Sequence, residues 1–207
     1  MARAKQVTEA EWLTPNGRRL VTHARRIASD RKQRLFGCGF CRLHWDRLAD
    51  DRLREAITIF ENYADKPKPA PGRLHAAELI AQANWNQPDT DLDTDLWQCV
   101  HAASFSVANG ASEAIPLLRS RPVQNAILRD LFGNPFRPVG FLPSWRTSAA
   151  VGVARSMYEA RDFAAMPILA DALQDAGCED STILSHCRGD GPHVRGCWVV
   201  DLVLGKS

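Results

Sequence analysis

Apolar residues recur at three- and four-residue intervals along almost all of this 207-residue chain. One clear stripe consists of Leu53, Ile57, Phe60 and Ala64. Such spacing places apolar side chains on one face of a helix, whereas the alternation typical of strands is almost absent. The pattern therefore predicts an all-α fold, a compact multi-helix domain of antiparallel helix pairs with little or no sheet.

Two stretches rich in proline interrupt this pattern, residues 65–72 (DKPKPAPG) and residues 133–147 (GNPFRPVGFLPSWRT). The second is the longest irregular stretch in the chain. We expect a single helical domain over residues 1–207, in which residues 133–147 join two lobes, 1–132 and 148–207.

Residues that favour helix ends mark several boundaries. Thr8 and Glu11 form a capping box, Ser29 can cap the next helix, and Pro122 and Gly133 suit the two ends of another. Further helices are predicted over 74–85 and 97–103, with the acidic residues 88–95 capping the second of these. In the last third of the chain, helices are predicted over 148–161, 163–176, 180–188 and 192–204, the last beginning at Pro192.

Composition excludes several classes of protein. The chain is 45% hydrophobic and 24% charged, which are ordinary globular values. Its uncharged apolar runs are far shorter than the ~18 residues that span a bilayer, and no apolar core follows the basic N-terminus. We therefore expect a soluble cytoplasmic protein without a membrane partner. In that setting the six cysteines are expected to be reduced.

Positive charge is concentrated at the N-terminal end. Residues 1–48 carry eleven Lys and Arg against four Asp and Glu, whereas the rest of the chain is acidic. One hypothesis is that this basic third binds nucleic acid or an acidic protein. The alternative is a basic helical face that pairs with acidic residues of the same chain.

Cys38, Cys41 and His44 follow one another at three-residue spacing, which places their side chains on one face of a helix. Cysteine and histidine are zinc ligands, but a tetrahedral site needs a fourth. That ligand would come from residues 186–197 or, more widely, from Cys99, Cys178, Cys187, Cys197 or a distant histidine. The alternative is that both cysteines are small core residues. No second C-x-x-C pair is present.

Residues 186–206, HCRGDGPHVRGCWVVDLVLGK, hold the densest group of reactive side chains. If the final helix begins near His193, its free amide groups together with Arg188 and Arg195 could bind an anion or a partner carboxylate. The alternative is an internal clasp, in which the arginines pair with acidic residues such as Asp171, Asp175 or Asp201.

Five segments resemble an uncharacterised bacterial family that recurs in many copies in large genomes: TEAEWL, SDRKQRLFGCGFCRLHW, LRDLFGNPFRPV, PILADALQDAGC and HCRGDGPHVRGCWVVDLVLGK. Phe40 stands where the family pattern ACACCRR-x-W has a cysteine, which argues against a cysteine-rich site. The segment ILADALQDAGC is also similar to the ADWLEE-type helix of a short repeat found beside leucine-rich repeats. The resemblance implies a helical module used for interaction, with no activity and no catalytic residues to carry over.

No complete catalytic motif accompanies these features. We therefore expect a non-enzymatic adaptor or scaffold that binds another protein. The first alternative is a zinc- or thiol-dependent protein that uses a Cys/His cluster. The second is nucleic-acid binding through the basic N-terminal third.

Overall fold

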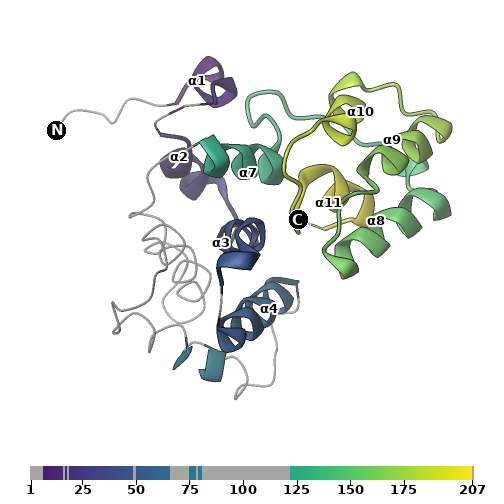
Figure 1. Ribbon diagram of the computed structural model, residues 1–207. Coiled ribbons are helices and arrows are strands. Elements are labelled where there is room, and N and C mark those ends of the chain that lie inside the picture. The colour runs from purple at the N-terminus through teal and green to yellow at the C-terminus, as the bar shows by residue number, and fades with distance from the viewer. Residues whose placement is uncertain are drawn as a thin grey trace. The chain divides into compact units, whose positions relative to one another are not determined.

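The computed structural model describes residues 7–15, 17, 19–48, 50–65, 75–77, 79–80 and 122–206 (Figure 1). Every regular element within these ranges is a helix, which confirms the all-α prediction. The predicted helix 74–85 lies mostly outside the described residues, as does the spacer 65–72. The predicted acidic turn 88–95 and helix 97–103 lie wholly outside them.

The chain divides into two compact units, an N-terminal unit of Met1–Leu128 and a C-terminal unit of Arg129–Ser207. The division falls within helix α7 (Pro122–Phe132), upstream of the segment 133–147 where the sequence predicted a junction. The Pro/Gly-rich segment therefore belongs to the C-terminal unit.

The N-terminal unit includes α1 (Glu9–Leu13), α2 (Leu20–Ile27), α3 (Asp30–Leu43), the 3-10 turn η1 (Trp45–Arg47), α4 (Asp51–Asp65) and the start of α7, and residues 75–77 and 79–80 are also helical. Two predicted caps are confirmed. The Thr8 hydroxyl accepts the Glu11 amide at 3.2 Å, and the Ser29 hydroxyl accepts the Lys32 amide at 3.4 Å. These bonds satisfy amide groups that would otherwise lack a partner at each helix start.

Helices α3 and α4 pack closely, and an arginine fixes their contact. The Arg42 guanidinium donates to both carboxylate oxygens of Glu61, at 2.9 and 2.8 Å, and to the Thr58 hydroxyl at 2.9 Å. The same guanidinium lies 3.8 Å from the centre of the Trp45 ring. The Glu61 side chain is 1% exposed, so this two-point ion pair is largely removed from water.

The C-terminal unit continues with the 3-10 turn η2 (Pro143–Trp145), α8 (Ser148–Ala160), α9 (Met166–Asp175), α10 (Ser181–Arg188) and α11 (Trp198–Leu204). Helix α8 packs against α9 and α11, and α9 packs against α10. Their inner faces form one hydrophobic core, which includes Ala154, Leu169, Leu173, Ile183, Val199 and Val203. The core also contains the buried residues Cys178, Cys187 and Cys197.

The prediction that the last helix begins at Pro192 is wrong, because α11 begins at Trp198. A helix cannot run from Pro192 to Trp198, because Gly196 has a φ of 93°, which a right-handed helix does not allow. The Val194 amide donates to the carboxylate of Asp130. The reactive residues before Trp198 therefore lie in an irregular turn.

In the part of the chain that the structure describes, none of the helices is both long and apolar enough to cross a membrane. The cytoplasmic location stays a prediction.

Replacement of Arg42 by alanine should destabilise the N-terminal unit by about 3 kcal/mol, because Glu61 would stay buried without its main counter-charge. Chemical denaturation followed by circular dichroism measures this change. Arg52→Ala is the matched control, since Arg52 pairs with Asp50 on the surface with its side chain 74% exposed. Equal losses for the two variants would contradict the assigned role of the Arg42–Glu61 pair.

Candidate metal centre

Four side chains of the C-terminal unit converge on one point although they come from separate stretches of the chain. Asp130 lies in the last turn of α7, His186 lies near the end of α10, and His193 and Cys197 lie in the turn between α10 and α11. One ligand atom from each lies within 4.8 Å of every other. Among the described residues, no other group of three or more such side chains gathers in this way.

Helix α10 positions His186. The Asp180 carboxylate caps the helix by accepting the amides of Thr182 at 2.8 Å and Ile183 at 3.1 Å. Ile183 and Cys187 are buried in the core and fix the rotation of the helix about its axis. His186 stands beside this buried face, where its side chain is 19% exposed.

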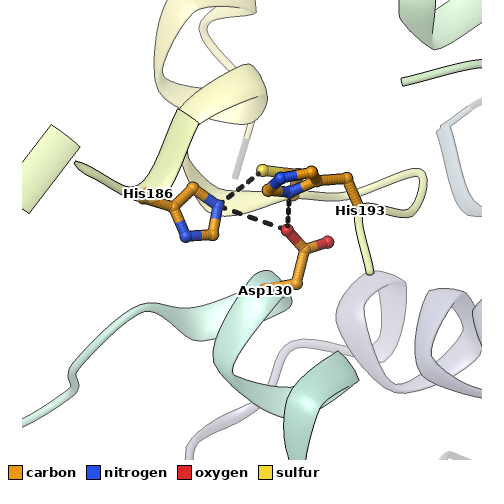
Figure 2. Close-up of side chains that lie close together, drawn as sticks. Asp130, His186 and His193 are labelled. Atoms are coloured by element: carbon orange, nitrogen blue, oxygen red, sulfur yellow. Dashed lines mark hydrogen bonds and ion pairs between the residues drawn. The ribbon is translucent and has the colours of Figure 1, made fainter. Parts of the chain in front are cut away.

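Three short contacts link the four side chains, as Figure 2 shows for the labelled Asp130, His186 and His193. Nε2 of His186 lies 3.2 Å from the Cys197 sulfur and 3.2 Å from Oδ1 of Asp130. Nδ1 of His193 lies 2.7 Å from the same Oδ1. Oδ1 of Asp130 thus faces two imidazole nitrogens, and Nε2 of His186 faces one oxygen and one sulfur.

The shared nitrogen argues against a cysteine–histidine–aspartate catalytic triad. In a triad the nucleophile contacts one imidazole nitrogen and the carboxylate orients the other. Here the Cys197 sulfur and the Asp130 oxygen both face Nε2 of His186. A single hydrogen on Nε2 cannot point at both atoms, whereas a cation placed among them would satisfy all three.

The pKa of Cys197 also argues against a catalytic triad. Burial raises the pKa of the Cys197 thiol well above its usual value, and the neighbouring Asp130 charge adds to the effect. Such a thiol is not an activated nucleophile. Burial also acts to raise the pKa of Asp130, but the hydrogen bonds to His186 and His193 outweigh it, and the pKa of Asp130 lies below the usual range.

The second oxygen of Asp130 is already committed. Oδ2 accepts the Val194 backbone amide at 2.9 Å, which leaves Oδ1 directed at the two imidazoles. This bond orients the carboxylate, and outer hydrogen bonds of this kind commonly orient metal ligands. The arrangement suits a carboxylate that binds a metal through one oxygen.

The donor set of one sulfur, two imidazole nitrogens and one carboxylate oxygen fits zinc. Calcium and magnesium prefer oxygen ligands alone, whereas zinc accepts all three donor types. Ligand atoms around a tetrahedral zinc lie about 3.3–3.7 Å apart, and the two 3.2 Å contacts of His186 come close to this range. The 2.7 Å contact of His193 has hydrogen-bond length, so metal binding would have to move its two atoms apart by about 0.6 Å or more.

The residues predicted to bind an anion or a partner all contact their own chain. Arg188 donates to Asp171 and Gln174, each at 2.8 Å, as the clasp interpretation expected for Asp171. Arg195 lies 4.6 Å from the centre of the Tyr158 ring. His193 and the Val194 amide do contact an anion, but it is the carboxylate of Asp130.

Cys38, Cys41 and His44 do not gather into a group of metal ligands within the described residues. Both cysteines are buried in α3, and the Cys38 sulfur lies 3.9 Å from the Ile57 carbonyl oxygen. His44 stacks on Phe40 at 4.4 Å between ring centres, with Nδ1 3.0 Å from the Phe40 carbonyl oxygen. Cys99 lies outside the described residues, so the prediction of zinc at these positions stays a prediction.

Several residues of the basic N-terminal third pair within the N-terminal unit. Arg31 contacts Asp65 at 2.9 Å, Arg42 contacts Glu61, and Arg34 lies 4.4 Å from the centre of the Tyr63 ring. These contacts agree with the alternative of a basic face that pairs with acidic residues of the same chain. Nucleic-acid binding and adaptor function both stay predictions.

Asp130 is the residue of the cluster that sequence analysis missed. The signal was present, because Asp130 follows Ile127 by three residues and precedes Leu131, both of which are buried. A carboxylate on the apolar stripe of a helix must find a partner when the helix packs. Its ligand partners lie more than fifty residues away in sequence, and helical periodicity carries no information about them.

Comparisons of this chain with protein-family models, with curated proteins and with solved structures found no match. The resemblance to a multi-copy bacterial family therefore stays a prediction, and the cluster must be interpreted from its own chemistry.

Replacement of Asp180 by alanine should destabilise the C-terminal unit by about 1 kcal/mol, because α10 would lose both hydrogen bonds of its cap. Thermal unfolding measures the loss. Asp180→Asn is the matched control, since asparagine also caps helices well and should retain most of the stability. An alanine variant as stable as the asparagine variant would show that the cap does not fix α10.

Proposed function

We propose that Asp130, His186, His193 and Cys197 bind one Zn²⁺, and that the chain is a helical module whose C-terminal unit is held together by this ion. The observation that carries the proposal is the position of His186 Nε2, 3.2 Å from both the Cys197 sulfur and the Asp130 oxygen. Convergence of sulfur, nitrogen and oxygen donors on a single point is what a tetrahedral metal requires.

The site suits a structural ion better than a catalytic one. A catalytic zinc keeps one position open for water or substrate, whereas structural zinc has four protein ligands. Here four protein ligands are present, and the side chains of Asp130 and His193 are 3% and 8% exposed. Cys197 is fully buried in the core. Little room is left for a substrate beside the ion.

Charge balance also favours zinc. Zinc binding displaces the thiol proton of Cys197, and the resulting thiolate and the Asp130 carboxylate together carry two negative charges, which the ion neutralises while both imidazoles stay neutral. Unbalanced charge in a buried site is costly, so a neutral set of four ligands and one divalent ion suits these surroundings. A structural ion of this kind is compatible with the predicted adaptor role, because the outer helix faces then take no part in catalysis.

The purified protein should contain close to one zinc ion per chain by elemental analysis. Cys197→Ala should lose the ion, because zinc would lose its thiolate ligand. Cys187→Ala is the matched control, since Cys187 is a buried cysteine of the same core that is not one of the four ligands. Cys41→Ala tests the other predicted site in the same way.

Zinc retained by Cys197→Ala and lost by Cys41→Ala would refute the assignment in favour of the α3 cysteines. A wild-type protein that binds no zinc, even after reconstitution with zinc salts, would refute both sites.

Removal of the metal with a chelator should lower the unfolding temperature of the wild-type protein. An ion present at a thousandfold its dissociation constant stabilises the folded state by about 4 kcal/mol. His193→Ala should already have the lower unfolding temperature and should not respond to the chelator. Differential scanning calorimetry measures both effects. An equal response of wild type and variant to the chelator would contradict a structural role for the ion at this site.

A further inference from the structure

We infer that Trp198 is a positioning residue for the metal centre, which holds the His186 ring in its ligand orientation and slows release of the ion. The inference rests on the proposed function, because it concerns retention of the same metal. Trp198 is not a ligand. It is the first residue of α11 and directly follows the ligand Cys197.

The rings around His186 form a small aromatic cluster. The Trp198 ring centre lies 5.2 Å from that of His186 with an interplanar angle of 53°. The His193 ring lies 5.0 Å from His186 with an angle of 78°. His186 is the most exposed of the four ligands, at 19%. Contact with two rings limits its rotation and removes part of its surface from water.

Gly133 explains how the Trp198 ring reaches this position. Gly133 ends α7 with a φ of 61°, and a Cβ atom there would lie 3.2, 3.3 and 3.4 Å from Cδ2, Cε2 and Cγ of Trp198. Three similar distances indicate that the indole lies face-on against the glycine backbone. The chain therefore needs glycine at this position for two reasons, the left-handed conformation and the space for the indole.

The Trp198 indole contacts one ligand and lies close to chain segments that carry two others. Gly133 follows the ligand Asp130 by three residues, Trp198 adjoins the ligand Cys197, and the indole contacts the ligand His186. Outer groups that hydrogen-bond to metal ligands typically change metal affinity 10- to 100-fold when replaced, and we expect a ring that packs on a ligand to act in the same direction. We therefore assign to Trp198 a share of the metal retention beyond its share of core packing.

The test is the rate at which Co²⁺-substituted protein releases its metal to a chelator, followed by the absorption of the cobalt–thiolate centre. Trp198→Leu should release cobalt about 10- to 100-fold faster than wild type and shift the cobalt absorption. Trp198→Phe keeps a flat ring and should restore most of the wild-type rate. Phe163→Leu is the matched packing control, because Phe163 packs against the same core while the rings that contact His186 are those of His193 and Trp198.

A second pair of variants separates backbone strain from ring position. Gly133→Ala and Gly205→Ala introduce a side chain at nearly equal φ angles of 61° and 65°. A Cβ at position 205 meets nothing within 4 Å, whereas a Cβ at position 133 meets the Trp198 indole. Only Gly133→Ala should speed cobalt release. This pair also decides the question if Trp198→Leu does not fold.

The outcomes distinguish the two proposals. A wild-type protein that forms no cobalt–thiolate absorption would overturn the metal centre and with it the role of Trp198. Wild-type binding with unchanged release from both Trp198→Leu and Gly133→Ala would overturn the role of Trp198 alone. Equal acceleration by Phe163→Leu and Trp198→Leu would reduce Trp198 to an ordinary core residue.

Discussion

The buried carboxylate of Asp130 is the group on which the rest of the C-terminal unit depends. Its side chain is 3% exposed and its pKa lies below the usual range, so it is ionised in a place that water scarcely reaches. A buried charge is stable only when other groups balance it. The Val194 amide and the two imidazoles face the carboxylate, and they bring the segment between α10 and α11 to the end of α7.

The need to balance the buried charge of Asp130 explains how the C-terminal unit can end with short helices. Helices α10 and α11 span only Ser181–Arg188 and Trp198–Leu204, and isolated helices of this length are unstable in water. Burial of their inner faces in one core supplies part of the stability. The irregular turn between them has few apolar side chains to bury, and polar contacts to Asp130 hold it instead. An ion bound at this turn would hold α10 and α11 in place.

Much of the fold could be predicted because its signals are local. The caps at Thr8 and Ser29 depend on residues three positions apart, and the glycine ends at Gly133 and Gly205 reflect a left-handed conformation that glycine adopts easily. Apolar spacing likewise identified the helices. The start of α11 was misjudged because Pro192 suits a first helical turn, whereas the positive φ of Gly196 prevents the chain from becoming helical until Trp198.

The candidate site was predictable only in part, because sequence patterns carry information about neighbouring residues and little about distant ones. Residues 186–197 stood out by composition, and they supply His186, His193 and Cys197. The sequence instead predicted a zinc site at Cys38, Cys41 and His44, to which residues 186–197 would add a fourth ligand. Cys38 and Cys41 are buried in α3. Residue type alone is a poor guide to a cluster when one of its members comes from a distant helix.

The four proposed ligands are not neighbours in the sequence, and this spacing has a consequence for the order of folding and metal binding. Ligands close in sequence can bind zinc before the rest of a domain folds, as in small zinc-binding modules. Here α7 must already lie against the α10–α11 turn before Asp130 and the histidines meet. An ion at this site would therefore act late in folding and stabilise a helical core that has already formed. That order fits an ion that stabilises a fold already formed, and it explains why the packing of Trp198 against Gly133 should affect how long the ion is retained.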